Sequence, residues 1–261
     1  MSKTKKKAST AIAVPTGFSK VADVSQERAE EFQSTNMPWI GFQAKAGDTA
    51  MKVVKAIDGI ETGHPFVSLP GDNFLPLKGA KLFVLPDLTL DYYIEYSKGS
   101  SSKKANAYFK DEPRALMDQI RETKDRSRYV TEAVEAVTVI LLPDNDLGLD
   151  SVVAMTRFEG AKRRFATGLR TAVANTLKPE WAKLNGFHQA MIDGGVPAGY
   201  RVAGKIKIVP KTSRATGETY YTAYAETETP TGEDLDRLVA VNLDDALTAF
   251  NKRTGWVKKQ F

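Results

Sequence analysis

Residues 151–170 read SVVAMTRFEGAKRRFATGLR, and their hydrophobic period changes half-way. Residues 151–158 are an apolar run typical of a strand, whereas from Gly160 onward apolar residues recur at intervals of three and four, as on one face of a helix. A single acid, Glu159, lies among the basic residues of this junction, which are Arg157, Lys162, Arg163, Arg164 and Arg170. The stretch therefore predicts a strand that leads directly into a basic helix.

Short β-like runs lie on both sides of this junction. Residues 80–86, 88–97 and 135–143 precede it, and residues 200–210 and 218–227 follow it as a predicted hairpin. In the second run, period-two alternation predicts one core-facing set of side chains. That set is Leu88, Leu90, Tyr92, Ile94 and Tyr96.

The order of these elements predicts an α+β fold, an antiparallel OB-like β-barrel with a helix inserted between its third and fourth strands. Other α+β folds are compatible with the same order. A further amphipathic helix is expected over residues 231–253, because its first turn is acidic and its last turn basic. We expect a basic flexible arm at 1–20, the barrel domain with its helical insertions at 21–229, and the C-terminal helix and basic tail at 230–261.

Composition excludes several classes of protein. The chain has 261 residues, a net charge of +5 and no cysteine, which rules out disulfides, thiolate nucleophiles and metal sites built on sulfur. No run is long and apolar enough for a membrane helix or a signal segment. We therefore expect a cytoplasmic protein in a reducing compartment.

Three sequence features could indicate a catalytic or metal-binding site, but each lacks residues or a context that such a site requires. Residues 199–206, GYRVAGKI, lack the Ser or Thr of a phosphate loop and precede an alternating strand instead of a helix. Residues 144–150, DNDLGLD, lack the ligands of a calcium loop and read as a turn. His64 and His188 have no partner motif and are interpreted as structural. We expect no enzyme activity, metal or cofactor.

Basic side chains interleaved with aromatic ones offer a better lead to function. Lys205 and Lys207 share one face of their strand, and Tyr220 and Tyr224 share one face of its partner, so pairing can place cations beside rings. Cations that follow phosphates and rings that stack on bases are what single-stranded nucleic acid requires. The full predicted interface also draws on a basic loop and on the basic helix, and comprises Tyr93, Lys98, Lys103, Lys104, Arg157, Lys162, Arg163, Arg170, Lys205, Lys207, Lys211, Arg214, Tyr220 and Tyr224.

Residues 80–228 resemble the OB-fold single-stranded DNA-binding proteins of bacteriophages and related mobile elements. The resemblance rests on the stretch 140–173, on the hairpin 204–227 and on the strand and loop at 88–104. It implies a non-catalytic protein that coats single-stranded DNA during replication or recombination in a bacterial host cell, alongside replication or recombination proteins. It also implies phosphate contacts by Arg157, Lys162, Arg163, Lys205, Lys207 and Arg214, and base contacts by Tyr93, Tyr220 and Tyr224. The basic end GWVKKQF departs from the acidic tail of many such proteins.

Two other interpretations stay open at this point. The chain could be a virion or scaffold component that self-associates as a homo-oligomer through its basic start and acidic C-terminal helix. It could also be an enzyme whose carboxylates are too dispersed along the chain to be recognised. The residue pattern by itself fits single-stranded RNA as well as DNA.

Overall fold

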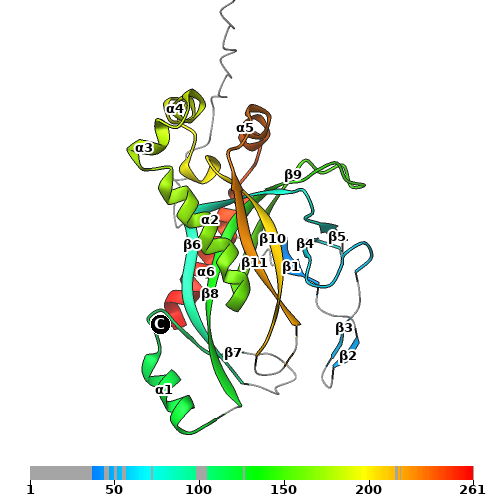
Figure 1. Cartoon of the computed structure of the whole chain (residues 1–261), viewed down its shortest axis with the longest axis vertical. Coiled ribbons are helices and arrows are strands. Elements are labelled where there is room, and N and C mark those ends of the chain that lie inside the picture. Colours follow the sequence, from blue (N-terminus) through cyan, green and yellow to red (C-terminus); the bar gives the residue numbers. More distant parts are fainter. Residues whose placement is uncertain are drawn as a thin grey trace, which may run out of the picture.

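The computed structural model describes residues 37–43, 47–49, 52–54, 57–71, 73–97, 105–125, 127–214, 217 and 219–260. A long antiparallel sheet forms its centre, with α2 in front of it and α6 behind it (Figure 1). The expected arm at 1–20 and the basic loop with Lys98, Lys103 and Lys104 lie outside the described residues. The predicted α+β class with antiparallel sheets is confirmed.

The central sheet has the strand order β11-β10-β6-β8-β9, with β7 paired to the far end of β6. Its strands are β6 (Lys81–Ser97), β7 (Ala105–Phe109), β8 (Arg128–Leu141), β9 (Ser151–Glu159), β10 (Ala203–Thr212) and β11 (Thr219–Glu228). A second sheet has the order β1-β4-β5 and consists of β1 (Trp39–Phe42), β4 (Pro65–Leu69) and β5 (Asn73–Pro76). A two-stranded ribbon pairs β2 (Gly47–Thr49) with β3 (Lys52–Val54).

The helices lie between and after these strands. α1 (Arg114–Glu122) lies between β7 and β8, and the turn η2 (Gly160–Lys162) leads from β9 into the basic helix α2 (Arg163–Asn175), as predicted. The connection to β10 contains α3 (Pro179–Ala182), α4 (Gly186–Asp193) and η3 (Ala198–Tyr200). The chain continues after β11 with α5 (Gly232–Val239) and α6 (Asp244–Gln260).

Two predicted strands are in fact one strand, β6, with an irregularity inside it. The register against β8 shifts between Val84 and Thr89, where Pro86 cannot donate a backbone hydrogen bond. Before the shift, Leu82 and Val84 belong to the core that α2 covers, whereas after it the even-numbered Tyr92 belongs to a cluster on the opposite face. The shift therefore moves the even-numbered side chains of β6 from one face of the sheet to the other.

Each face of the sheet has its own core. On the α2 face, Phe165 and Leu169 pack on Phe158 and Ala154 of β9 and on Ala223 of β11. On the opposite face, side chains of α4, α5 and α6 cover β6 and β8. The buried residues of this second core include Phe83, Val139, Met191, Leu235, Leu238, Leu247 and Phe250.

The expected OB-like β-barrel is not confirmed. β9 and β11 end the sheet on opposite sides, and within the described residues they do not pair with each other. The sheet β1-β4-β5 lies between them: the Ile40 amide donates to Thr156 Oγ1 of β9 at 2.6 Å, and a Cβ on Gly63 would lie 2.5 Å from the Tyr221 ring of β11. The sheet β1-β4-β5 and the loop before β4 thus contact both edge strands of the central sheet.

The single helix expected over residues 231–253 is divided into α5 and α6. Thr231 caps α5 together with Asp234, and the Asn242 side chain accepts from the Asp244 amide at 2.8 Å at the start of α6. Residues 240–243 are non-helical, because Val241 packs into the second core. Val241 lies between the end of α5 at Val239 and Asn242, which caps α6. Ala246, Leu247 and Phe250 of α6 pack on the chain's own sheet, so α6 buries its apolar face within the same molecule.

Asp234 joins the start of α5 to the central sheet. Its carboxylate accepts from Lys81 Nζ and from the Thr231 amide, both at 2.7 Å, and its side chain is only 7 % exposed. Burial raises the pKa of Asp234, but the hydrogen bonds from Lys81 and Thr231 outweigh burial and hold the pKa below its ordinary value. The ionised carboxylate is therefore part of the folded state.

We expect Asp234→Ala to lower the free energy of unfolding by about 1–3 kcal/mol at pH 7, because the variant loses a helix cap and a part-buried ion pair. Since the folded-state pKa is depressed, this contribution is complete above the unfolded pKa of about 4 and is lost as pH falls through the folded value. Urea titrations between pH 7 and pH 3 measure it, with the exposed Asp236→Ala as control. Equal losses in the two variants at pH 7 would contradict this role.

Candidate functional site

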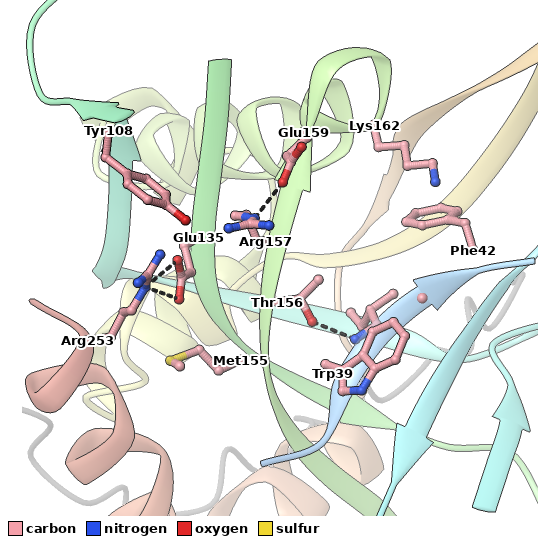
Figure 2. A pocket seen from close by; sticks show the side chains of 12 residues that line it. Trp39, Phe42, Tyr108, Glu135, Met155, Thr156, Arg157, Glu159, Lys162 and Arg253 are labelled. Atoms are coloured by element: carbon pink, nitrogen blue, oxygen red, sulfur yellow. Dashed lines mark hydrogen bonds and ion pairs between the residues drawn. The ribbon is translucent and has the colours of Figure 1, made fainter. Parts of the chain in front are cut away.

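A pocket of about 790 Å³ lies on the α6 side of β8 and β9 (Figure 2). Met155, Arg157 and Glu159 of β9 face it, because they alternate with Ala154 and Phe158, which face the core under α2. β1 lies along the β9 edge, where the Met155 amide donates to the Pro38 carbonyl oxygen at 3.0 Å, and α6 forms the wall on the other side. We refer to this pocket as the groove.

A row of hydrogen-bonded polar side chains crosses the floor of the groove. Glu135 of β8 is paired with Arg157 of β9 in the strand register, and Arg157 Nε lies 2.5 Å from Glu159 Oε1. The Tyr96 hydroxyl donates to the same Glu159 oxygen at 3.0 Å, and the Tyr92 hydroxyl donates to Glu135 Oε2 at 2.6 Å. Each floor carboxylate thus accepts a hydrogen bond from a tyrosine, and Glu159 is also paired with Arg157.

The protonation states of this row follow from its burial. Burial raises the pKa of Tyr92 and of Tyr96 well above the ordinary value, and the nearby carboxylates raise both further. Burial lowers the pKa of Arg157, but Glu159, Tyr92 and Tyr96 together outweigh burial, and the pKa is raised. At neutral pH both tyrosines are therefore hydrogen-bond donors, and the arginine is charged.

Arg253 anchors α6 at the end of this row. Its Nε donates to both carboxylate oxygens of Glu135, at 3.0 and 2.9 Å, and a second guanidinium nitrogen donates to the Tyr92 hydroxyl at 3.1 Å. The guanidinium carbon also lies 5.8 Å from the centre of the Tyr108 ring. One side chain therefore joins the C-terminal helix to β6, β7 and β8.

Aromatic rings from two strands line the groove. Trp39 and Phe42 come from β1 and Tyr108 comes from β7, and Trp39 is 47 % exposed. Trp39 packs edge-on against Phe66 with ring centres 5.7 Å apart, and Gly41 lies so close to both rings that a side chain would clash. Lys162 Nζ lies 4.3 Å from the centre of the Phe42 ring. The groove thus brings exposed aromatic surface next to cationic groups.

The structure brings together only part of the predicted interface. Arg157 and Lys162 lie in the groove. Arg163 and Arg170 lie on the other side of the sheet, where Arg163 pairs with Glu132 and Arg170 donates to both oxygens of Asp91 at 2.8 and 2.7 Å. Tyr93 lies on that same side, since it alternates along β6 with Tyr92, which faces the groove side.

The hairpin residues form a separate group. Lys207 is paired with Tyr224 and Lys211 with Tyr220 in the register of β10 and β11, so cations and rings share one face, as predicted. Lys211 Nζ lies 5.5 Å from the centre of the Tyr224 ring. Tyr220 is 44 % exposed, and Arg214 is exposed near the tip.

Five of the predicted cations are paired with carboxylates. The pairs are Arg157–Glu159, Arg163–Glu132, Arg170–Asp91, Lys205–Glu228 and Lys207–Glu226. Four of these acids are distant in the chain from their cation, so a count of local charge could not detect them. A phosphate at these five positions would compete with a carboxylate for each cation.

Several residues of the groove were not recognised in the sequence. Trp39 and Phe42 lie in the run PWIGF, whose sequence does not show which apolar side chains are buried. In the structure Ile40 is buried, whereas its neighbour Trp39 is exposed. Arg253 lies in the basic last turn of the expected C-terminal helix, and the sequence indicates no partner for it. Tyr108 follows the loop that lies outside the described residues. None of these residues belongs to a sequence motif. Each lies in the groove only because folding brings residues that are distant in the chain close to it.

The features that the sequence analysis interpreted as structural, His188, the 144–150 turn and residues 199–206, have structural roles in the fold. His188 stacks on Trp181 at 4.1 Å between ring centres and lies within hydrogen-bond distance of Thr229 Oγ1, at 3.2 Å, which is a structural role. Asn145 closes the 144–150 turn by accepting from the amides of Leu147 and Leu149. Gly204 and Lys205 lie in strand β10, not at a helix start. In the described part of the chain no cluster of three or more His, Asp or Glu side chains is arranged to hold a metal ion.

Comparisons of the chain with protein-family models, with curated proteins and with solved structures found no match. None of the described helices is long and apolar enough to cross a membrane.

We expect Arg253→Ala to lower the free energy of unfolding by about 3 kcal/mol, because it leaves the carboxylate of Glu135, 8 % exposed, without its cation. Urea titration measures the loss, and hydrogen exchange of the α6 amides should show that this helix opens first. The neighbouring exposed Lys252→Ala serves as the matched control. If Arg253→Ala were as stable as Lys252→Ala, Arg253 would not anchor α6.

Proposed function

We propose that the protein binds single-stranded DNA without regard to sequence and without chemical change, and that the groove is the principal contact site. The observation that carries the proposal is the convergence of Trp39, Phe42 and Tyr108 with Lys162 and Arg157 in one pocket. Rings of this kind stack on unpaired bases of any sequence, and adjacent cations neutralise phosphates. In duplex DNA the bases are already stacked, so the rings favour a single strand.

The strand order supports an OB-type arrangement. Taken in chain order, β6, β8, β9, β10 and β11 are five strands in which the first lies between the second and the fourth, and α2 lies between the third and the fourth. A partly open five-stranded Greek-key barrel has this arrangement, with the inserted sheet β1-β4-β5 taking the place of the closing pair. We propose that the domain is an OB-like barrel modified in this way.

The position of the groove agrees with that arrangement. OB-folds bind oligonucleotides on the face of their second and third strands, between the loop after the first strand and the loop after the fourth. Here those strands are β8 and β9, which form the groove floor. The loop with Lys98, Lys103 and Lys104 follows β6, and the tip with Arg214 follows β10. The proposal therefore connects the sequence-predicted basic loops with a site that was found only in the structure.

Ion pairing sets the expected salt dependence. Arg157 and Arg253 are each paired with a floor carboxylate, so few of the cations can contact phosphates without losing an acid partner. Each phosphate contact on a single strand contributes about −0.7 to the slope of log K against log salt concentration. With about three or four contacts we expect a slope near −2 to −3. Stacking therefore has to supply much of the affinity.

We expect a fluorescent dT20 oligonucleotide to bind in an anisotropy titration, with affinity that falls as salt rises. Trp39→Ala should weaken binding about five- to hundredfold, because loss of one stacked base costs about 1–3 kcal/mol. dT20, mixed-sequence and RNA oligonucleotides are compared at each salt concentration, and a hairpin duplex measures the preference for single strands.

Leu184→Ala is the matched control, since it removes an exposed apolar side chain at a position outside the groove. Wild-type protein that fails to bind dT20 at 50 mM salt would refute the proposed function. Equal affinities of Trp39→Ala and Leu184→Ala would show that the groove is not the contact site.

A further inference from the structure

Two cations outside the groove converge on one uncharged side chain. Arg164, at the start of α2, donates to the Tyr224 hydroxyl at 2.8 Å, and Lys211 of β10 donates to the same oxygen at 2.9 Å. Arg164 also lies 5.8 Å and Lys211 5.5 Å from the centre of the Tyr224 ring. We call these three residues the tyrosine cluster.

The tyrosine cluster differs from the other basic positions in its electrostatics. Lys205 and Lys207, on the same strand as Lys211, pair with Glu228 and Glu226. Within the described residues no carboxylate pairs with Arg164 or Lys211. Two like charges held about one hydrogen-bond length from the same oxygen repel each other, so an anion placed between them is attracted by both.

Backbone geometry connects the tyrosine cluster to the groove. Gly160 starts the turn η2 with φ of 54°, a left-handed conformation that glycine adopts without strain, and the chain then passes from β9 into α2. Three successive side chains leave this segment in different directions: Lys162 lies over the Phe42 ring, Arg163 pairs with Glu132, and Arg164 contacts Tyr224. Lys162 and Arg164 thus link the groove and the tyrosine cluster through two residues of backbone.

We propose that the tyrosine cluster is a phosphodiester-binding subsite, and that one strand occupies the groove and this subsite together. The inference rests on the proposed function and specifies its ligand: an oligonucleotide long enough to reach from the Phe42 ring across the start of α2 to the hairpin. A mononucleotide or a very short oligomer fills the groove alone. Sequence independence follows, because the subsite contacts only the sugar–phosphate backbone.

Binding of a phosphate changes the hydrogen bonds of Tyr224. In the free protein the hydrogen bond from Lys211, with a further contribution from Arg164, lowers the pKa of the Tyr224 hydroxyl. When the two cations turn to a phosphate oxygen, the hydroxyl loses those donors and lies beside an anion. Its pKa then rises, which provides a spectroscopic sign of occupancy at this one position.

Length-dependent binding tests the subsite. The double variant Arg164→Ala/Lys211→Ala should bind dT20 at least tenfold more weakly than wild type in 50 mM salt, and its salt slope should be smaller by about 0.7, for one lost phosphate contact. Its affinity for dT4 should equal that of wild type. Lys207→Ala is the matched control, because this lysine is on the same strand but pairs with Glu226.

Each result separates this inference from the proposed function. Suppose that Trp39→Ala loses dT20 binding, whereas the double variant and Lys207→Ala bind dT20 equally well. This result would overturn the subsite but would still support the groove as the contact site. Absence of dT20 binding in wild type would overturn both. NMR titration of labelled tyrosine, assigned with Tyr224→Phe, should show a higher Tyr224 pKa with dT20 bound, and an unchanged value would also overturn the subsite. Thermal unfolding of each variant confirms that it is folded.

Discussion

The register shift in β6 is the constraint on which the rest of the structure depends. Because Pro86 interrupts the ladder with β8, one continuous strand presents Leu82 and Val84 to the core under α2 and Tyr92 to the opposite face. Tyr92 then donates to Glu135, and Glu135 in turn holds Arg253 of α6. Without the shift, Tyr92 and Tyr96 would face the core under α2, and Glu135 and Glu159 would lose the tyrosine hydroxyls that donate to them.

The groove combines rigid walls with a polar floor whose charges are satisfied internally. Burial of Glu135 is tolerated because Arg253 and Tyr92 both donate to it, and removal of either donor leaves a poorly solvated charge. The aromatic side of the groove is held differently, since β1 attaches to the β9 edge through the Ile40 amide and Thr156. The position of the aromatic rings is thus fixed by hydrogen bonds of the backbone at β1, whereas the charged groups are held by side-chain networks. Under the proposed function, the nucleic acid would bind a surface that is already organised, which lowers the entropy lost on binding.

Charge pairing decides which basic residues can act on a ligand. Lys205 and Lys207 are spaced on one strand face as a phosphate-tracking pair would be, yet each lies against a glutamate of β11. Arg164 and Lys211 have instead a phenol between them. The contrast arises within a single hairpin and its neighbouring helix, so exposure alone does not separate these groups. What separates them is the partner that folding brings within about one hydrogen-bond length.

Local pattern by itself determined the strand-to-helix junction at 151–170, the hairpin β10–β11 and the core-facing side of residues 88–96, because backbone preference and hydrophobic period act over a few residues. The local pattern predicted one helix over residues 231–253, where the structure has the two helices α5 and α6. The break at 240–243 was not predicted, because it arises from the packing of Val241. The pairing of Arg163 with Glu132, of Arg170 with Asp91 and of Arg253 with Glu135 required the tertiary structure. The physical reason is that electrostatic partners and groove walls are set by distances in space between residues far apart in the chain, whereas periodicity reports only which side of its own element a residue faces.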